Sequence, residues 1–223
     1  MSRQVYEFDF KDRHFRFHNT ADSKELIEHI FTDNYKVLAS NIDFQPGDVI
    51  LDVGANEGIF SIMMAKLYPH TRIIAIEPVS RTIAALMDNI ALNDIANIYP
   101  AKIALGKERG FHTMNISKDH SGGSSGVIRF NPQDHIQEEV QIMTFDELLK
   151  SFEINKVKLM KMDIEGGEYE ALYFSDMSKV EYFAGEIHSN AYLSYNNSHP
   201  HMLINWLSDR VKLLGVEICK MSD

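Results

Sequence analysis

The stretch Val49–Phe60, VILDVGANEGIF, constrains the fold of this chain more than any other. It opens with Val49–Leu51, an apolar run in which two of three residues are β-branched, as is typical of a strand buried on both faces of a parallel sheet. Gly54 and Gly58 allow a tight turn and let the backbone approach a ligand closely. Apolar residues then recur at helical spacing. The pattern predicts a strand, a turn and a helix that together form a nucleotide-type binding element.

A second acidic position supports this prediction. Arg72–Ile76 is a candidate buried strand, and Glu77-Pro78 closes it, where a carboxylate can accept hydrogen bonds from both hydroxyls of a ribose. The G-x-G-x-x-G pattern of dinucleotide sites is not met, because Asn56 stands at the second glycine position. Asp52 would repel a phosphate, and is better suited to a cation such as the amino or sulfonium side of S-adenosylmethionine. A dinucleotide-dependent oxidoreductase is therefore the weaker alternative.

The rest of the chain alternates strand and helix, which predicts an α/β fold with a doubly wound, mostly parallel sheet. Residues 1–45 are expected to form an N-terminal cap, not an independent domain, made of a hairpin over Val5–Phe17 and helices over 23–31 and 35–42. Residues 46–223 are expected to form the binding domain. The expected later strands are 97–101, 139–143, 157–162, 180–187 and 216–220, the helices are 79–92, 168–174 and 199–214, and a hairpin insertion lies between Gly106 and Glu139. Thr144-Phe145-Asp146-Glu147 reads as a helix capping box.

Three motifs, taken together, resemble one family. Asp52-Val53-Gly54-Ala55-Asn56-Glu57-Gly58, Ile76-Glu77-Pro78 and Lys161-Met162-Asp163-Ile164-Glu165-Gly166-Gly167-Glu168 look like those of the FkbM-type S-adenosylmethionine-dependent methyltransferases. The resemblance implies a Rossmann-like class I methyltransferase fold and O-methylation of a hydroxyl on a sugar, glycan or polyketide-like metabolite. That fold usually has a seventh, antiparallel strand, which we expect to be missing here or replaced by the N-terminal cap. The expected cofactor-binding residues are Asp52, Gly54, Ala55, Asn56, Glu57, Gly58, Glu77, Pro78, Lys102 and Asp163.

The candidate catalytic residues are Asp163, Glu186 and His188. Asp163 closes the fourth core strand and should lie beside the glycine turn, because the first and fourth strands flank the switch point of such a sheet. Alternation along the fifth strand puts Glu186 and His188 on one face, near Asp163. Either Asp163 or His188 could act as a general base, or carboxylates could hold a divalent metal. The sequence does not require a metal. A cofactor-binding module without catalysis is the remaining alternative.

Composition limits the partners. The formal charge of −10 argues against broad contact with nucleic acid, which normally needs a basic face. No apolar run is long enough to insert into a membrane, and Cys219 is the single cysteine, so no intramolecular disulfide can form. We therefore expect a soluble, cytoplasmic protein that acts on a small-molecule or glycan substrate. The identity of the acceptor and the oligomeric state stay open.

Overall fold

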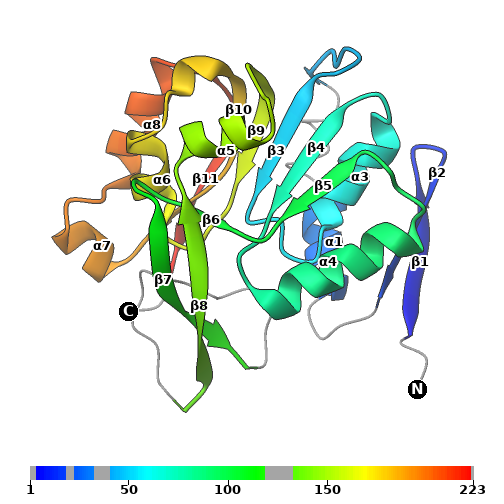
Figure 1. Ribbon diagram of the computed structural model, residues 1–223, viewed down its shortest axis with the longest axis horizontal. Coiled ribbons are helices and arrows are strands. Elements are labelled where there is room, and N and C mark those ends of the chain that lie inside the picture. The colour runs from blue at the N-terminus through cyan, green and yellow to red at the C-terminus, as the bar shows by residue number, and fades with distance from the viewer. Residues whose placement is uncertain (1–3, 19–22, 33–40, 119–132, 222–223) are drawn as a thin grey trace.

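The core of the protein is a parallel sheet of six strands, ordered β11-β10-β9-β3-β4-β5 (Figure 1). The computed structural model describes residues 4–18, 23–32, 41–118 and 133–221. Every neighbouring pair in this sheet is parallel, which confirms the doubly wound fold predicted from the sequence. The strands are β3 (Val49–Val53), β4 (Arg72–Ile76), β5 (Ile98–Ala101), β9 (Val157–Met162), β10 (Val180–Ser189) and β11 (Lys212–Lys220).

Helices cover both faces of the sheet, because the strands are apolar on both sides. Ile50 belongs to the core shared with α3 (Ile59–Leu67) and α4 (Ser80–Leu92). Leu51 and Val53 belong to the opposite core, shared with α5 (Phe145–Ser151), α6 (Glu168–Tyr173) and α8 (Pro200–Ser208). Each fully buried side chain of this kind contributes about 1.5–3 kcal/mol. These two cores fix the strand order, and with it the position of the strand ends.

The order of strands reverses between β3 and β9. From β3 the chain builds β4 and β5 to one side, while β9, β10 and β11 continue to the other. The carboxyl ends of β3 and β9 are therefore neighbours, and the Asp163 N–H donates to the Val53 carbonyl at 3.0 Å. Ligands of open α/β sheets bind at this switch point.

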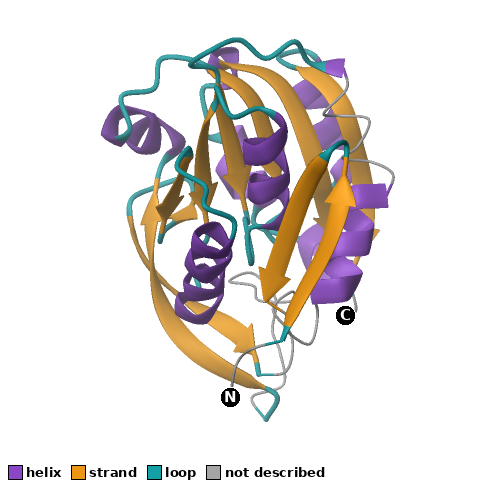
Figure 2. Ribbon diagram, turned by 90° about the vertical axis from the view of Figure 1, so that its right-hand side faces the viewer, coloured by secondary structure: helices purple, strands orange, loops and turns teal. Residues whose placement is uncertain are grey.

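The N-terminal residues form a separate layer over α3 and α4 (Figures 1 and 2). Strands β1 (Val5–Phe10) and β2 (Arg13–His18) pair only with each other in the described chain, and α1 (Ser23–Thr32) follows. The buried Phe15 and Phe17 anchor the hairpin in the core that contains α3. The hairpin does not supply a seventh strand to the central sheet. The second helix expected at 35–42 falls almost wholly outside the described residues.

An insertion between β5 and α5 builds a second, three-stranded sheet. It contains β6 (Ala104–Leu105), β7 (Gly110–Ser117) and β8 (His135–Met143), with β7 and β8 antiparallel. The strand expected from residue 139 thus begins four residues earlier, because its first half pairs with β7. Residues 119–132 of the expected hairpin insertion lie outside the described residues.

The predicted helix at 199–214 is too long. Helix α8 ends at Ser208, and β11 begins at Lys212 by pairing with Tyr182 of β10. Leu213 and Leu214 continue the helical spacing of apolar residues, but parallel pairing with β10 overrides that local pattern. Short elements η1 (Met177–Lys179) and α7 (Ala191–Tyr195) complete the described chain. None of the helices in these described segments has the length and apolarity needed to cross a lipid bilayer.

The capping box predicted at the start of α5 is present and gives a stability test. The Thr144 hydroxyl accepts the Glu147 N–H at 3.2 Å, and the Glu147 carboxylate accepts the Thr144 N–H at 3.1 Å. Thr144→Ala should lower the free energy of unfolding by about 1 kcal/mol, measured by urea denaturation. The control is Ser151→Ala at the other end of the same helix, which should change it by less than about 0.5 kcal/mol. Equal effects of the two variants would contradict this role of the cap.

Candidate active site

The turn after β3 forms one wall of a cleft at the switch point. Gly54, Asn56 and Gly58 adopt positive φ angles of 77°, 49° and 84°. The turn is fastened to the next strand, because the N–H groups of Gly54 and Ala55 both donate to the Ile76 carbonyl, at 3.0 and 2.9 Å. The cleft holds about 110 Å³. Of the expected cofactor-binding residues, it is lined by Gly54, Ala55, Asn56, Glu57, Glu77, Pro78 and Asp163.

Glu77 connects the end of β4 to this turn. Its carboxylate accepts the Asn56 N–H at 3.1 Å and the Val79 N–H at 3.0 Å. Burial raises the pKa of Glu77 to about 7, although both N–H groups favour the ionised form. The Asn56 side-chain oxygen is buried in the cleft wall and has no hydrogen-bond partner among the described residues. The cleft wall therefore contains a buried carboxylate and a buried amide oxygen that has no hydrogen-bond partner among the described residues.

Asp52 does not face the cleft, contrary to its expected contact with a cofactor. It has no exposed surface, accepts the Ser61 hydroxyl at 2.7 Å, and pairs with the Lys161 ammonium at 3.4 Å. Alternation along β3 turns the Asp52 side chain toward α3 and away from the strand end. Its charge is paired with Lys161, and it also contributes to the raised pKa of Glu77.

Lys161 is a site residue that the sequence argument did not select. It lies in β9, and its ammonium donates to the Gly54 carbonyl at 2.9 Å and lies 4.0 Å from an Asp163 oxygen. The side chain is 5% exposed, so these contacts are shielded from water. The available signal was a lysine within the otherwise apolar end of the Val157–Met162 strand. A charge there needs a buried partner, which Asp52 supplies.

Two other expected cofactor-binding residues lie elsewhere. The Lys102 ammonium donates to the Ser80 hydroxyl and pairs with Glu138 at 3.2 Å, and its side chain is half exposed outside the cleft lining. The physical reason is that the chain turns away after β5 into the insertion, where Glu138 of β8 attracts the ammonium. Gly58 caps α3 and faces Leu86 behind the cleft wall.

The three candidate catalytic residues meet at the ends of β9 and β10, as their spacing predicts. The His188 Nε2 atom lies 3.9 Å from Asp163 and 3.8 Å from Glu186. Glu165 joins them at 3.6 Å from the same nitrogen. Burial raises the pKa of Asp163 to about 6, with Lys161 opposing the shift. The group brings one imidazole and three carboxylates to the mouth of the cleft.

The surroundings of His188 decide its protonation state. Its Nδ1 atom hydrogen-bonds the fully buried Glu168 carboxylate at 2.9 Å. Burial by itself lowers the pKa of His188, but the hydrogen bond and charge of Glu168, with further carboxylates nearby, raise it to about 9. The imidazole is therefore doubly protonated at neutral pH. This environment disfavours the expected role of His188 as a base and leaves Asp163 as the better candidate.

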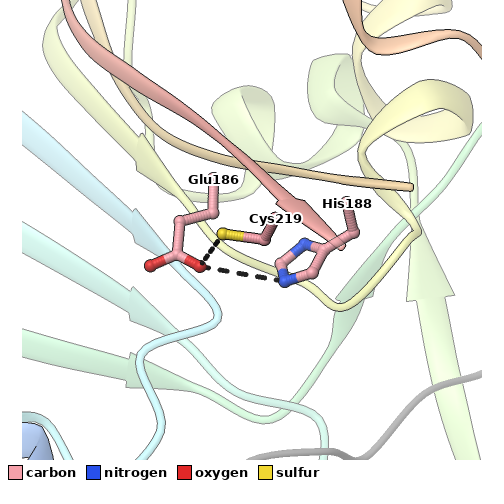
Figure 3. A group of neighbouring side chains, drawn as sticks. All are labelled: Glu186, His188 and Cys219. Atoms are coloured by element: carbon pink, nitrogen blue, oxygen red, sulfur yellow. Dashed lines mark hydrogen bonds and ion pairs between the residues drawn. The ribbon is translucent and has the colours of Figure 1, made fainter. Parts of the chain in front are cut away.

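Glu186 is held by contacts from three elements. One of its oxygens lies 3.2 Å from His29 Nε2 of α1, and the other accepts the Cys219 thiol of β11 at 2.9 Å. Figure 3 shows Cys219 and His188 directed at the same Glu186 oxygen. The hydrogen bond from His29 lowers the pKa of Glu186 to about 2 against the effect of burial. This carboxylate is thus ionised and joins the N-terminal layer to the site.

A second, larger cavity of about 590 Å³ adjoins the cleft and shares Gly54, Pro78, Met114 and Ile164 with it. Strands β7 and β8 of the insertion, helix α6 and the segment 192–198 surround it. The segment 192–198 brings Tyr192, Leu193 and the amide side chains of Asn196 and Asn197 to the cavity. The cavity could not be found from the sequence, because four elements far apart in the chain build it.

A family model described as the methyltransferase FkbM domain matches residues 52–212. This range covers the turn after β3, the end of β9 and the cluster around His188.

Similar proteins include "Methyltransferase 1" of Beauveria bassiana, 25% identical over 146 residues, which are 58% of this chain and 59% of that protein. The chain thus spans less than two thirds of this relative. "31-O-demethyl-FK506 methyltransferase FkbM" of Streptomyces tacrolimicus is 24% identical over 202 residues, 76% of each chain. "2-O-methyltransferase NoeI" of Sinorhizobium fredii is 25% identical over 142 residues, 57% of each chain.

Two glycines allow a matched test of the turn. A Cβ atom on Gly54 would lie 1.8 Å from the Asp163 carbonyl oxygen, whereas one on Gly47, at a similar φ of 86°, would meet nothing within 4 Å. Gly47→Ala should therefore show the cost of the left-handed conformation alone, about 1–2 kcal/mol of unfolding free energy. Gly54→Ala should lose about 2–5 kcal/mol, because β9 must also move. Urea unfolding of both variants measures the difference, and equal losses would argue against close packing at the switch point.

Proposed function

Because the chain belongs to the FkbM methyltransferase family, we propose that it transfers a methyl group from S-adenosylmethionine to a hydroxyl group of a small molecule. The observation that carries the proposal is the cleft at the switch point, lined by the glycine turn, Glu77 and Asp163. Family membership favours this reaction over the dinucleotide-dependent oxidoreductase. A measurement of turnover distinguishes the proposed methyltransferase from a cofactor-binding module without catalysis.

The residues of the cleft fit the methyl donor. The unpartnered oxygen of Asn56 is a natural acceptor for the donor's amino group, and Glu77 can accept hydrogen bonds from ribose hydroxyls. Lys161 and Asp163 border the same space. The bound donor would supply an electrophilic methyl group on a positively charged sulfur, which the nearby carboxylates favour electrostatically.

The adjoining cavity supports a small organic acceptor. Its volume of about 590 Å³ lies within the range of small-molecule sites, about 300–1,000 Å³. Apolar side chains such as Ile103, Leu105, Val140 and Ile142 line much of it. This lining favours a polyketide-like metabolite over a free sugar or a glycan. The names of the Streptomyces and Sinorhizobium relatives, a 31-O-demethyl-FK506 methyltransferase and a 2-O-methyltransferase, both describe methyl transfer to oxygen.

The acceptor hydroxyl must lose its proton as the new bond forms. Two arrangements of the described residues serve this purpose. Asp163 can accept the proton itself, since a carboxyl with a pKa of about 6 is partly matched to neutral pH. Alternatively, the carboxylates around His188 can hold a cation that lowers the pKa of the hydroxyl.

Ligand binding tests the proposed donor. S-adenosylhomocysteine should raise the melting temperature of the protein, whereas NAD at the same concentration should leave it unchanged, because only a ligand of the native state stabilises it. Transfer of labelled methyl from S-adenosylmethionine to members of a panel of hydroxylated metabolites tests the reaction. Stabilisation by NAD without stabilisation by S-adenosylhomocysteine would contradict the proposal.

Glu77 gives a sharper prediction. Glu77→Gln should weaken S-adenosylhomocysteine binding by about 1.5–3 kcal/mol in calorimetry, the range for hydrogen bonds to a charged group. The pKa of Glu77 is about 7, so the ionised acceptor accumulates as pH rises. Wild-type affinity should therefore increase between pH 6 and 8, and this increase should be smaller in Glu77→Gln.

The control for this prediction is Lys102→Met, since Lys102 is paired with Glu138 outside the cleft lining. Its affinity for S-adenosylhomocysteine should match that of the wild type. A loss of affinity as large as that of Glu77→Gln would indicate that Lys102 does contact the donor.

A further inference from the structure

His188 is the centre of an arrangement that the proposed methyl transfer does not by itself explain. Its Nδ1 atom is held by Glu168 at 2.9 Å. Glu168 is fully buried and is itself fixed by the N–H groups of Ile164 and Gly166, at 3.1 to 3.2 Å. A carboxylate that holds one ring nitrogen of a histidine orients the other nitrogen, as is common behind metal-binding histidines. The geometry therefore fixes the direction of Nε2.

The Nε2 atom points into a group of three carboxylates. It lies 3.6 Å from Glu165, 3.8 Å from Glu186 and 3.9 Å from Asp163. All three distances exceed those of a hydrogen bond, and the described residues provide no other hydrogen-bond partner for this nitrogen. The side chain is only 5% exposed. This ring nitrogen thus lies within ion-pair distance of three carboxylates, but makes no short hydrogen bond to any of them.

These separations are close to those between ligands of one metal ion. Two ligands about 2.1 Å from an ion, at right angles, lie about 3.0 Å apart. Asp163, Glu165 and His188 can each offer one atom so that all lie within 4.8 Å of one another. Two basic side chains adjoin the set, Lys161 at 4.0 Å from Asp163 and His29 at 3.2 Å from Glu186.

We propose that Asp163, Glu165 and His188, with Glu186 beside them, form a binding site for one divalent cation. The ion takes the place of the Nε2 proton of the imidazolium, which is released to water on binding. Carboxylate oxygens with a single imidazole suit a hard ion such as Mn²⁺ or Mg²⁺. Cys219 donates to the Glu186 oxygen that also faces His188 and orients it. A hard ion prefers that oxygen to the sulfur of Cys219. In Figure 3 the Cys219 thiol and the His188 ring both approach one Glu186 oxygen.

The role of the ion rests on the proposed methyl transfer, although its binding does not. Asp163 lines the donor cleft and belongs to the cation site, so the ion lies beside the position of the methyl group. An acceptor hydroxyl bound to the ion releases its proton to water more readily. Its oxygen then forms the bond to the methyl carbon while the carbon–sulfur bond breaks and its electron pair stays on sulfur.

Mn²⁺ binding to the metal-stripped full chain tests the site without any methyl donor. Free Mn²⁺ gives a six-line electron paramagnetic resonance signal that is lost on binding. Titration should show one saturable equivalent per chain. Glu165→Gln should weaken binding at least tenfold, and Asp163→Asn should do the same in an independently folded variant. The matched control is Glu181→Gln, on the same strand as Glu186 but paired with lysines at its other end, which should bind like the wild type.

The outcomes separate this inference from the proposed function. Absence of saturable Mn²⁺ binding, or equal binding by wild type and Glu165→Gln, overturns the cation site while S-adenosylhomocysteine binding can persist. Conversely, Mn²⁺ binding that depends on Glu165, in a protein that ignores S-adenosylhomocysteine, supports the site and contradicts the methyl donor. If both ligands bind, methyl transfer should stop with EDTA and return with Mn²⁺ or Mg²⁺.

Discussion

The close approach of the turn after β3 to the end of β9 is the constraint on which the site depends. Gly54 lies against the Asp163 carbonyl with no room for a side chain, and Lys161 reaches across to donate to the Gly54 carbonyl. Lys161 can be buried here because Asp52 supplies an opposite charge at 3.4 Å. One buried ion pair therefore fixes the two strand ends that form the cleft. Because the Lys161 and Asp52 side chains are shielded from water, the electrostatic attraction between them is stronger than it would be on the surface.

The same strand ends concentrate negative charge around His188. Asp163 follows β9, Glu165 comes next but one in a left-handed conformation at φ 54°, and Glu186 lies in the last part of β10. Such a group is electrostatically costly unless a cation is shared among the carboxylates. In the protein alone the doubly protonated imidazole serves that purpose, with Lys161 and His29 at the margins. A bound divalent ion would do so more strongly, and Asp163 would then belong to both the donor cleft and the proposed cation site.

The N-terminal layer and the insertion give the cleft its remaining walls. Helix α1 brings His29 to Glu186 and apolar residues to the donor cleft. The insertion sheet and the segment after β10 enclose the larger cavity on the other side of Gly54 and Ile164. The central sheet thus positions the candidate catalytic residues, while the N-terminal layer and the insertion shape the space that a ligand can enter. This division is common where function is grafted on a shared α/β scaffold.

The sequence by itself determined the parallel core, because apolar β-branched runs bounded by glycine, acidic or proline residues have few other solutions. It also determined the turn and the meeting of Asp163, Glu186 and His188, since strand order and alternation place residues at a common edge. Only the tertiary structure decided that Asp52 faces inward, that Lys102 pairs with Glu138, and that α8 gives way to β11. Each of these depends on a partner distant in the chain, and local pattern carries no information about such partners.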